Sequence, residues 1–153
     1  MARLVSAGIL LHRRRDGRSE VLLGHLGGPY WARKHERAWS IPKGVVEDGE
    51  EPIDAARREF SEELGVPVPV GTLVDLGTVR QSRKDVRIWA LEAELDPDTV
   101  VPGTFAMEWP PRSGRTLEVP ELDRVAWFDL ETAATVVVAA QAEHLQRLAA
   151  LSD

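Results

Sequence analysis

Cysteine is absent from this chain of 153 residues, and tyrosine occurs once, at position 30. Without cysteine the protein can form no disulfide, bind no metal through a thiolate and use no cysteine nucleophile. Long apolar runs are lacking too: none approaches the roughly 18 residues of a membrane-spanning helix, and the first residues do not resemble a signal peptide. We therefore expect a soluble, cytoplasmic protein that is stabilised by a hydrophobic core.

Basic residues are also fewer than acidic ones. The chain has 19 lysines and arginines against 25 aspartates and glutamates, which gives a net charge of −6 and a pI near 5.3. This balance argues against partners such as nucleic acid or a membrane surface, although an acidic protein still binds phosphates where a cation intervenes. Hydrophobic residues make up 43% of the chain, enough for one core. We expect a single domain over residues 1–153.

The most informative feature lies between residues 44 and 66. The pattern is Gly-x5-Glu-x7-Arg-Glu-x2-Glu-Glu-x-Gly-Val, and its fixed positions are Gly44, Glu50, Arg58, Glu59, Glu62, Glu63, Gly65 and Val66. At ordinary residue frequencies this set should arise by chance with a probability of roughly 10⁻⁷ in a chain of this length. An accidental match is therefore a poor explanation.

A helix is predicted inside this pattern, from Pro52 to Leu64. Proline suits the first turn of a helix, because its missing N–H would have had no partner there. Acidic residues at the same end, Glu50, Glu51 and Asp54, lie near the positive end of the helix dipole. Gly65 then ends the helix, because glycine takes a positive φ without a Cβ clash.

The predicted helix has two adjacent faces. Its apolar stripe, which should pack against a sheet, consists of Ile53, Ala56, Phe60 and Leu64. Glu59, Glu62 and Glu63 lie beside that stripe on an arc roughly 100° wide. Three carboxylates one turn apart repel each other, so a divalent cation is their natural partner, and Mg²⁺ prefers oxygen ligands. The alternative is a solvated charged face with arginine–glutamate pairs, which does not explain the glycine and glutamate that precede the helix.

The whole pattern resembles a complete Nudix box. The resemblance implies an α/β/α sandwich with a mixed β-sheet, and an enzyme that uses Mg²⁺, or Mn²⁺ in its place, to hydrolyse nucleoside diphosphates linked to another group. It further implies that Glu59, Glu62 and Glu63 are metal ligands together with the carbonyl oxygen of Gly44. One of these carboxylates, or a water that it holds, would activate the attacking hydroxide.

The same resemblance assigns supporting residues. Glu50 and Arg58 are expected to pair and so to orient Glu59. Phe60 replaces the aliphatic residue usual in the family, a change that should alter packing rather than chemistry. Lys43 directly precedes the box, where its ammonium could contact a substrate phosphate; a solvated loop lysine is the alternative.

Segments outside the box narrow the set of Nudix enzymes that the chain resembles. Residues 39–44, Trp-Ser-Ile-Pro-Lys-Gly, resemble dinucleoside polyphosphate and diphosphoinositol polyphosphate hydrolases. Residues 84–94 resemble the strand after the box in asymmetrical diadenosine tetraphosphate hydrolases, with Lys84 as a substrate-binding residue. Residues 121–130 resemble a later segment of those enzymes, which makes Glu121 a further metal ligand or water-activating carboxylate; Glu118 competes for that role. Those hydrolases carry a tyrosine 16 to 18 residues after the box, which this chain lacks.

Two further segments, both expected to be loops, are candidates for substrate selection. Residues 27–37 contain Tyr30, Trp31 and Arg33, and residues 105–114 contain Trp109 between two predicted strands. Aromatic side chains next to basic ones could stack a nucleobase and hold phosphates. Exposed aromatics also mark dimer interfaces, so either a monomer or a homodimer is consistent with them. The histidines show no ligand spacing, and we expect His144 at the surface.

The remaining elements alternate along the chain. We predict strands at residues 4–11, 20–26, 39–41, 72–79, 86–95 and 124–128, and a final helical region from Leu130 to Leu151 that Asp129 caps. A charged turn at residues 13–18, which contains four arginines, separates the first two strands. The leading function is hydrolysis of a dinucleoside polyphosphate such as diadenosine tetraphosphate. Alternatives are a pyrophosphatase for nucleoside triphosphates, nucleotide sugars or diphosphoinositol polyphosphates, and a non-catalytic nucleotide sensor.

Overall fold

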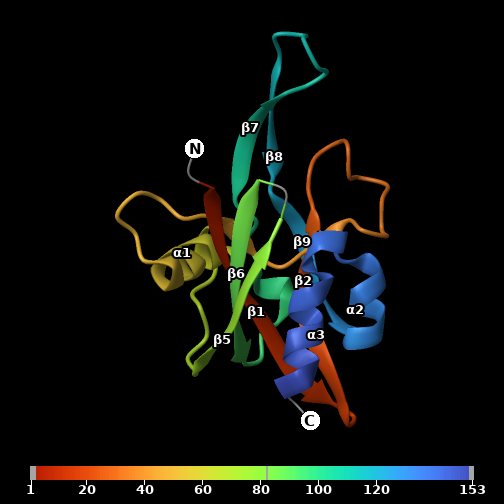
Figure 1. Ribbon diagram of the computed structural model, residues 1–153. Helices are drawn as coiled ribbons and strands as arrows, with labels where there is room; N and C mark the ends of the chain where they lie inside the picture. The colour runs from red at the N-terminus through yellow and green to blue at the C-terminus, as the bar shows by residue number, and fades with distance from the viewer. Residues whose placement is uncertain (1–2, 82, 152–153) are drawn as a thin grey trace.

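A mixed seven-stranded sheet forms the centre of the computed structural model, which describes residues 3–81 and 83–151 (Figure 1). The strands of this sheet are β1 (Leu4–Arg15), β2 (Arg18–Leu26), β3 (Trp39–Ser40), β4 (Lys43–Val45), β5 (Leu73–Arg80), β6 (Lys84–Glu92) and β9 (Leu122–Asp129). Their order is β3-β2-β1-β6-β5, with β4 also paired to β1 and β9 to β2. β1 and β6 run parallel, and the other pairs are antiparallel.

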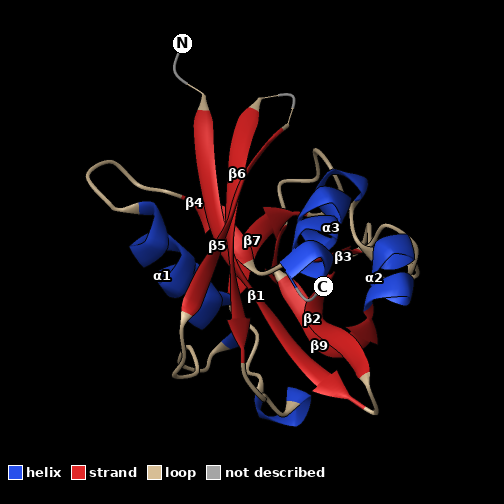
Figure 2. Ribbon diagram, turned by 60° about the horizontal axis from the view of Figure 1, so that its bottom comes forward, coloured by secondary structure: helices blue, strands red, loops and turns tan. Residues whose placement is uncertain are grey.

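Helices cover both faces of this sheet. α1 (Pro52–Leu64) lies on one side, and α2 (Leu130–Val136) and α3 (Ala142–Leu151) lie on the other (Figure 2). Two short 3₁₀ turns, η1 (Pro97–Thr99) and η2 (Ala139–Gln141), join longer elements. The predicted α/β sandwich with a mixed sheet is confirmed. In the described part of the chain, no helix is long and apolar enough to cross a membrane.

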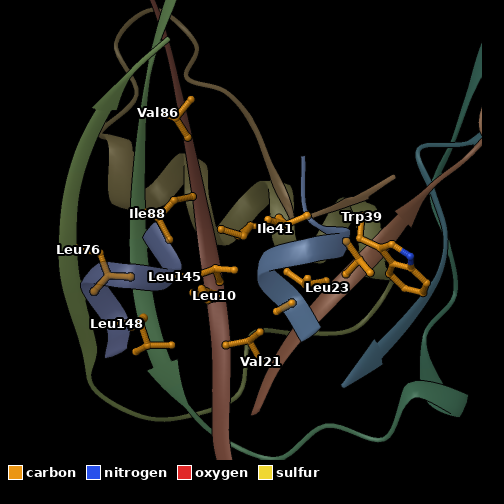
Figure 3. Packing of buried hydrophobic residues seen from close by; sticks show 14 of the residues in the cluster. Leu10, Val21, Leu23, Trp39, Ile41, Leu76, Val86, Ile88, Leu145 and Leu148 are labelled. Carbon is orange, nitrogen blue, oxygen red and sulfur yellow. The ribbon is translucent and has the colours of Figure 1, made fainter. Parts of the chain in front are cut away.

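The central strand β1 is apolar on both of its faces because each face is covered. Ile9 packs in the same buried cluster as Phe60 of α1, so Phe60 is a core residue as predicted. The adjacent Leu10 points the other way, into the cluster that contains Leu145 and Leu148 of α3 (Figure 3). Each of these side chains is at most 3% exposed. Burial of such a side chain contributes roughly 1.5–3 kcal/mol, so these two clusters fix the helices on the sheet.

The turn between β1 and β2 is shorter than the charged turn predicted at residues 13–18. Strand β1 continues to Arg15, and Asp16 and Gly17 form a two-residue turn with φ values of 54° and 76°. Two consecutive positive φ values match the right-handed twist of a hairpin, and Asp-Gly is a favoured pair for them. The arginines that suggested a charged loop are strand residues, because Arg13 bonds Glu20 across the hairpin at 2.8 Å.

The carboxyl-terminal helical region is interrupted, contrary to the prediction of one continuous region. Asp129 caps α2 as expected, since its carboxylate accepts a hydrogen bond from the Thr132 N–H at 2.7 Å. Val137, however, is extended and forms a bridge with Trp39, and the Val138 N–H donates to the Trp39 carbonyl at 2.8 Å. A pairing with a distant strand thus replaces a turn of helix.

A second correction concerns residues 105–114, which were predicted to form a loop. They belong to a two-stranded hairpin of β7 (Thr104–Glu108) and β8 (Thr116–Pro120), which projects from the body of the molecule (Figure 1). Cross-strand pairs such as Phe105 with Val119 and Met107 with Leu117 give the hairpin one apolar side. The alternation of apolar and polar residues in β7 was visible in the sequence.

His144 is fully buried rather than at the surface, because α3 places it against the β5 backbone. Its Nε2 lies 3.3 Å from the carbonyl oxygen of Gly77, and its Nδ1 has no partner among the described residues. Burial is the main cause that lowers the pKa of His144 from its ordinary value of 6.5. The unfolded chain therefore takes up this proton first as the pH falls.

We expect the free energy of unfolding to fall as the pH drops below about 6.5, with part of this decline due to His144. Urea denaturation between pH 5 and 7.5 would measure it. In His144→Gln the decline should be shallower, whereas His35→Gln, at an exposed position, should follow the wild type. Parallel curves for the wild type and His144→Gln would contradict the assignment.

Candidate active site

Helix α1 has the predicted bounds, Pro52–Leu64, and its ends are formed as expected. Proline occupies the first turn, and Gly65 takes a φ of 66° while its N–H donates to the Ser61 carbonyl at 2.8 Å. The apolar stripe is buried against the sheet. Glu63, which lies beside this stripe, is also buried and is only 6% exposed. Packing of α1 therefore holds the Glu63 carboxylate in a largely buried position.

Three carboxylates meet beside α1. Oxygen atoms of Glu59, Glu63 and Glu121 all lie within 4.8 Å of one another. They line a cavity of about 230 Å³, whose other lining residues are Glu62, Gly103 and Thr104. The structure thus places Glu121 with the box residues, 58 positions away from Glu63 in the chain. Glu118 is not a member of this group of three; its carboxylate accepts a hydrogen bond from Oγ1 of Thr104, which lines the cavity.

Gly44 approaches this group so closely that a side chain at this position would displace the Glu59 carboxylate. A Cβ atom on Gly44 would lie 2.0 Å from Cδ of Glu59 and 2.1 Å from Oε2. The preceding residue also contacts the group, because the Lys43 N–H donates to Oε2 of Glu63 at 3.2 Å. Strand β4 is held in this place by its pairing with β1, where Gly44 lies opposite Ala7. The absent side chain of Gly44 thus makes room for the Glu59 carboxylate.

Burial and neighbouring carboxylates raise the pKa of two members of this group, Glu63 and Glu59. Burial, followed by the charges of Glu121 and Glu59, raises the pKa of Glu63 to about 9. Burial also raises the pKa of Glu59, and the hydrogen bond from Arg58 opposes that rise. Carboxylate oxygens brought together at such a cost, in a cavity that solvent reaches, suit a hard divalent cation such as Mg²⁺. Glu59, Glu63 and Glu121 are therefore the residues that would hold it.

Arg58 pairs with Glu50, as predicted. Its Nε and Nη2 donate to the two carboxylate oxygens of Glu50 at 2.9 and 3.0 Å, and its Nη1 donates to Glu59 at 2.8 Å. The pair lowers the pKa of Glu50 to about 2 and raises that of Arg58. Arg58 also binds Glu62 at 3.2 Å, so Glu62, whose side chain is 60% exposed, lines the cavity without joining the close group of three.

Replacement of Arg58 by lysine should lower kcat about 10- to 100-fold, because one ammonium group cannot bind Glu50 and orient Glu59 at once. Stability should change little, since partly exposed ion pairs contribute at most about 1 kcal/mol. Steady-state kinetics with saturating Mg²⁺ and thermal melts would separate the two effects. Arg57→Lys, at the exposed neighbouring position, serves as the control. Equal kcat values for both variants would argue against an orienting role for Arg58.

The two lysines predicted to bind substrate lie together. Burial is the main cause that lowers the pKa of Lys43 to about 8, and the nearby ammonium of Lys84 lowers it further. The carboxylates of Glu63 and Glu59 oppose this shift, so Lys43 lies within the electric field of the acidic group. Lys43 thus lies near the carboxylates, and Lys84 lies near Lys43. Neither lysine lines the acidic cavity, so their part in phosphate binding stays a prediction.

The other predicted substrate residues lie on two projecting segments. In the loop between β2 and β3, Tyr30 is 61% exposed, and the Lys34 ammonium lies 3.6 Å above its ring. Trp31 packs partly against the core, and Arg33 is exposed. Trp109, 36% exposed, is on the hairpin. None of these four residues lines the acidic cavity, so their part in binding stays a prediction.

Gly103 and Thr104 line the cavity and were missed in the sequence. A Cβ on Gly103 would lie 2.2 Å from the backbone oxygen of Glu62, so this glycine also allows a close approach to α1. The Gly103 N–H donates to the Glu63 carbonyl oxygen at 3.2 Å, and its own carbonyl accepts from the Glu121 N–H at 3.1 Å. A lone glycine after a proline carries no signal of such a contact in one sequence.

Comparison with known proteins agrees with this geometry. A family model of the NUDIX domain matches residues 2–148, and the chain therefore belongs to the Nudix hydrolase family. An octanoyltransferase of Myxococcus xanthus is 38% identical over 104 residues, which cover 66% of this chain and 26% of that protein. An RNA pyrophosphohydrolase of Bartonella bacilliformis is 53% identical over 30 residues, 20% of this chain and 18% of that protein.

Solved structures share the whole fold at low identity. The Ap4A hydrolase of C. elegans, in a binary complex, superposes with a TM-score of 0.66 and 24% identity over 96% of this chain and 97% of that one. This likeness shows the fold. The sequence matches span only about a quarter or less of the two curated relatives named above, so their names give no activity to this chain.

Proposed function

We propose that the protein hydrolyses a phosphoanhydride bond in a nucleoside diphosphate linked to another group, with Mg²⁺ as cofactor. The observation that carries this proposal is the meeting of Glu59, Glu63 and Glu121 in one cavity beside the ammonium group of Lys43. Like charges at this spacing destabilise the fold unless a cation is bound.

The residues of the site would have different roles in this reaction. Glu59, Glu63 and Glu121 would hold the cation, with Glu62 and the Gly44 carbonyl as further oxygen donors at its edge. When bound, such a cation neutralises phosphate charge and lowers the pKa of water. Arg58 fixes the direction of the Glu59 carboxylate, and Lys43 attracts a phosphate. The water oxygen attacks one phosphorus, the bridging P–O bond breaks, and a carboxylate of the site accepts the proton.

The substrate that we infer is a dinucleoside polyphosphate of the diadenosine tetraphosphate kind. Lys43 and Lys84 supply two positive charges for a phosphate chain longer than a diphosphate. Beyond them, the exposed Tyr30 and Trp109 offer ring faces for nucleobases, each worth about 1–3 kcal/mol when stacked. The fold shared with the C. elegans Ap4A hydrolase supports this proposal, although the tyrosine usual after the box is missing.

A substrate panel in ¹⁸O-labelled water tests both the proposed hydrolysis and the proposed substrate class. It should contain dinucleoside polyphosphates, nucleoside triphosphates, nucleotide sugars, diphosphoinositol polyphosphates and 5′-triphosphorylated RNA. We expect the highest kcat/KM for a dinucleoside tetraphosphate, and mass spectrometry of the products locates the phosphorus attacked. Faster turnover of another class would replace the substrate. Nucleotide binding without any product, under Mg²⁺ and Mn²⁺ alike, would indicate a sensor.

A further inference from the structure

Of the three carboxylates in the acidic group, two belong to α1, and the third, Glu121, does not. It lies between β8 and β9 at the base of the hairpin, where the register that pairs Thr104 with Pro120 continues to Gly103 and Glu121 (Figure 1). Its N–H donates to the Gly103 carbonyl oxygen at 3.1 Å, and its carbonyl oxygen accepts from the Gly27 N–H at 2.9 Å. Two glycines therefore hold the backbone of Glu121 through its donor and its acceptor.

Gly103 connects Glu121 to α1. The Gly103 N–H donates to the Glu63 carbonyl oxygen at 3.2 Å, so this one residue bonds the backbones of two members of the acidic group. A Cβ on Gly103 would lie 2.2 Å from the backbone oxygen of Glu62, closer than the 3.0 Å that Cβ contacts respect. A side chain here would therefore push this segment away from α1.

Gly27 contacts the same segment from the end of β2. A Cβ on Gly27 would lie 1.9 Å from the carbonyl oxygen of Pro120 and 2.9 Å from its carbonyl carbon. These are backbone atoms of the residue that directly precedes Glu121, so they cannot rotate away as the end of a long side chain does. Neither Gly27 nor Gly103 has a positive φ. Alanine at either position would thus introduce a clash without the strain of a left-handed backbone.

We propose that Gly27 and Gly103 are positioning residues of the metal site, whose close backbone contacts set the place of the Glu121 carboxylate in the acidic group and thereby the affinity for a divalent cation. The inference rests on the proposed function for the role of these carboxylates as metal ligands. Mg²⁺ demands near-ideal octahedral geometry at short oxygen distances, so a small shift of one carboxylate weakens its binding. Both glycines act through the backbone of Glu121.

Gly27→Ala should raise the Kd for Mn²⁺ about 10- to 100-fold, the range observed when a residue that orients a metal ligand is changed. Electron paramagnetic resonance of Mn²⁺ measures this Kd without substrate, and circular dichroism checks the fold. Gly71→Ala is the matched control, because its Cβ would lie 2.7 Å from Cδ1 of Leu91 and Gly71 does not line the acidic cavity. Its Kd should equal that of the wild type. An unchanged Kd in Gly27→Ala would overturn the inference.

A double-mutant cycle distinguishes positioning of Glu121 from a general effect on the fold. Glu121→Gln removes the charge that Gly27 is inferred to place. If Gly27 acts through this carboxylate, adding Gly27→Ala to Glu121→Gln should change the Kd for Mn²⁺ by less than about twofold. Full multiplication of the two single effects would contradict positioning. Gly103→Ala repeats the cycle from the other glycine and replaces Gly27→Ala should that variant not fold.

Amide exchange in the unaltered protein supplies a test that depends on no variant. A cation held by Glu121 suppresses opening of the segment that carries it. Mg²⁺ should therefore slow exchange of the Gly27 and Glu121 amides more than that of the Val138 amide, which bonds Trp39 between α2 and α3. Equal slowing at all three would overturn the inference.

These measurements also separate the inference from the proposed function, because none of them requires turnover. A protein that binds Mn²⁺ and shows the expected effects of Gly27→Ala, but hydrolyses no member of the substrate panel, would refute the proposed function and leave the positioning role intact. Hydrolysis together with an unchanged Kd in both glycine variants would have the opposite meaning. Absence of Mn²⁺ binding by the wild type would overturn both.

Discussion

Glu63→Gln should reduce kcat by more than about 100-fold with Mg²⁺ saturating, while the protein stays folded. Loss of a residue that only supports a metal ligand already costs about 10- to 100-fold, and Glu63 contributes an oxygen to the group itself. Steady-state kinetics with the preferred substrate would measure the effect. Glu131→Gln, an exposed glutamate on α2, is the control and should retain full activity. Undiminished turnover in Glu63→Gln would remove the metal assignment.

Glu63→Gln should also weaken the pH dependence of the free energy of unfolding once divalent ions are removed. The folded-state pKa of Glu63, about 9, is raised above the ordinary value of 4.5. The unfolded chain therefore loses this proton first, and stability falls as the pH rises from about 4.5 to about 9. Glutamine cannot ionise, so in EDTA the variant should lose less stability over this range than the wild type, as urea denaturation at a series of pH values would show.

Gly44→Ala should abolish most activity with little loss of stability. The new Cβ would lie 2.0 Å from Cδ of Glu59, which is the far end of a flexible side chain, so Glu59 can move away at small cost. Its carboxylate then leaves the group of three, and we expect kcat to fall more than about 100-fold. The free energy of unfolding, followed by thermal melts, should fall by no more than about 1 kcal/mol, the average cost of a single substitution.

Gly17→Ala offers the matched control for this prediction. No atom lies within 4 Å of a Cβ on Gly17, but its φ of 76° disfavours alanine, so it should lose roughly 1 kcal/mol of stability and no activity. Comparison of the two variants thus separates the effect of a steric clash in the site from the effect of backbone strain far from it. If Gly44→Ala retains wild-type kcat, the close approach of β4 to Glu59 has no catalytic importance.

The parts of this structure that the sequence predicted are those governed by local geometry. The bounds of α1, the burial of Phe60 and the Glu50–Arg58 pair follow from 3.6 residues per turn and from a fixed spacing. Glu121 came from resemblance to a family rather than from spacing, and the structure places it beside Glu63. Its role, like the roles of the other site residues, is for the experiments above to decide.

The parts that were missed depend on contacts between distant segments. The break at Val137 exists because β3 lies beside it, and the burial of His144 depends on the β5 backbone. Gly103 matters because a Cβ atom at this position would lie 2.2 Å from the backbone oxygen of Glu62 in α1. None of these partners can be inferred from one sequence without the tertiary structure. The hairpin is different, since its alternation was present and only its length of five residues per strand concealed it.

The β7–β8 hairpin has a consequence for how this enzyme family diversifies. Its two strands pair with each other and form a sheet separate from the seven-stranded one, within the part of the chain that the structure describes. Insertions or exchanges at its tip would therefore leave the seven-stranded sheet and the carboxylates in place. The hairpin is thus a segment whose length and sequence can change without loss of the acidic cavity, and exchange with the hairpin of a relative would measure its share in substrate preference.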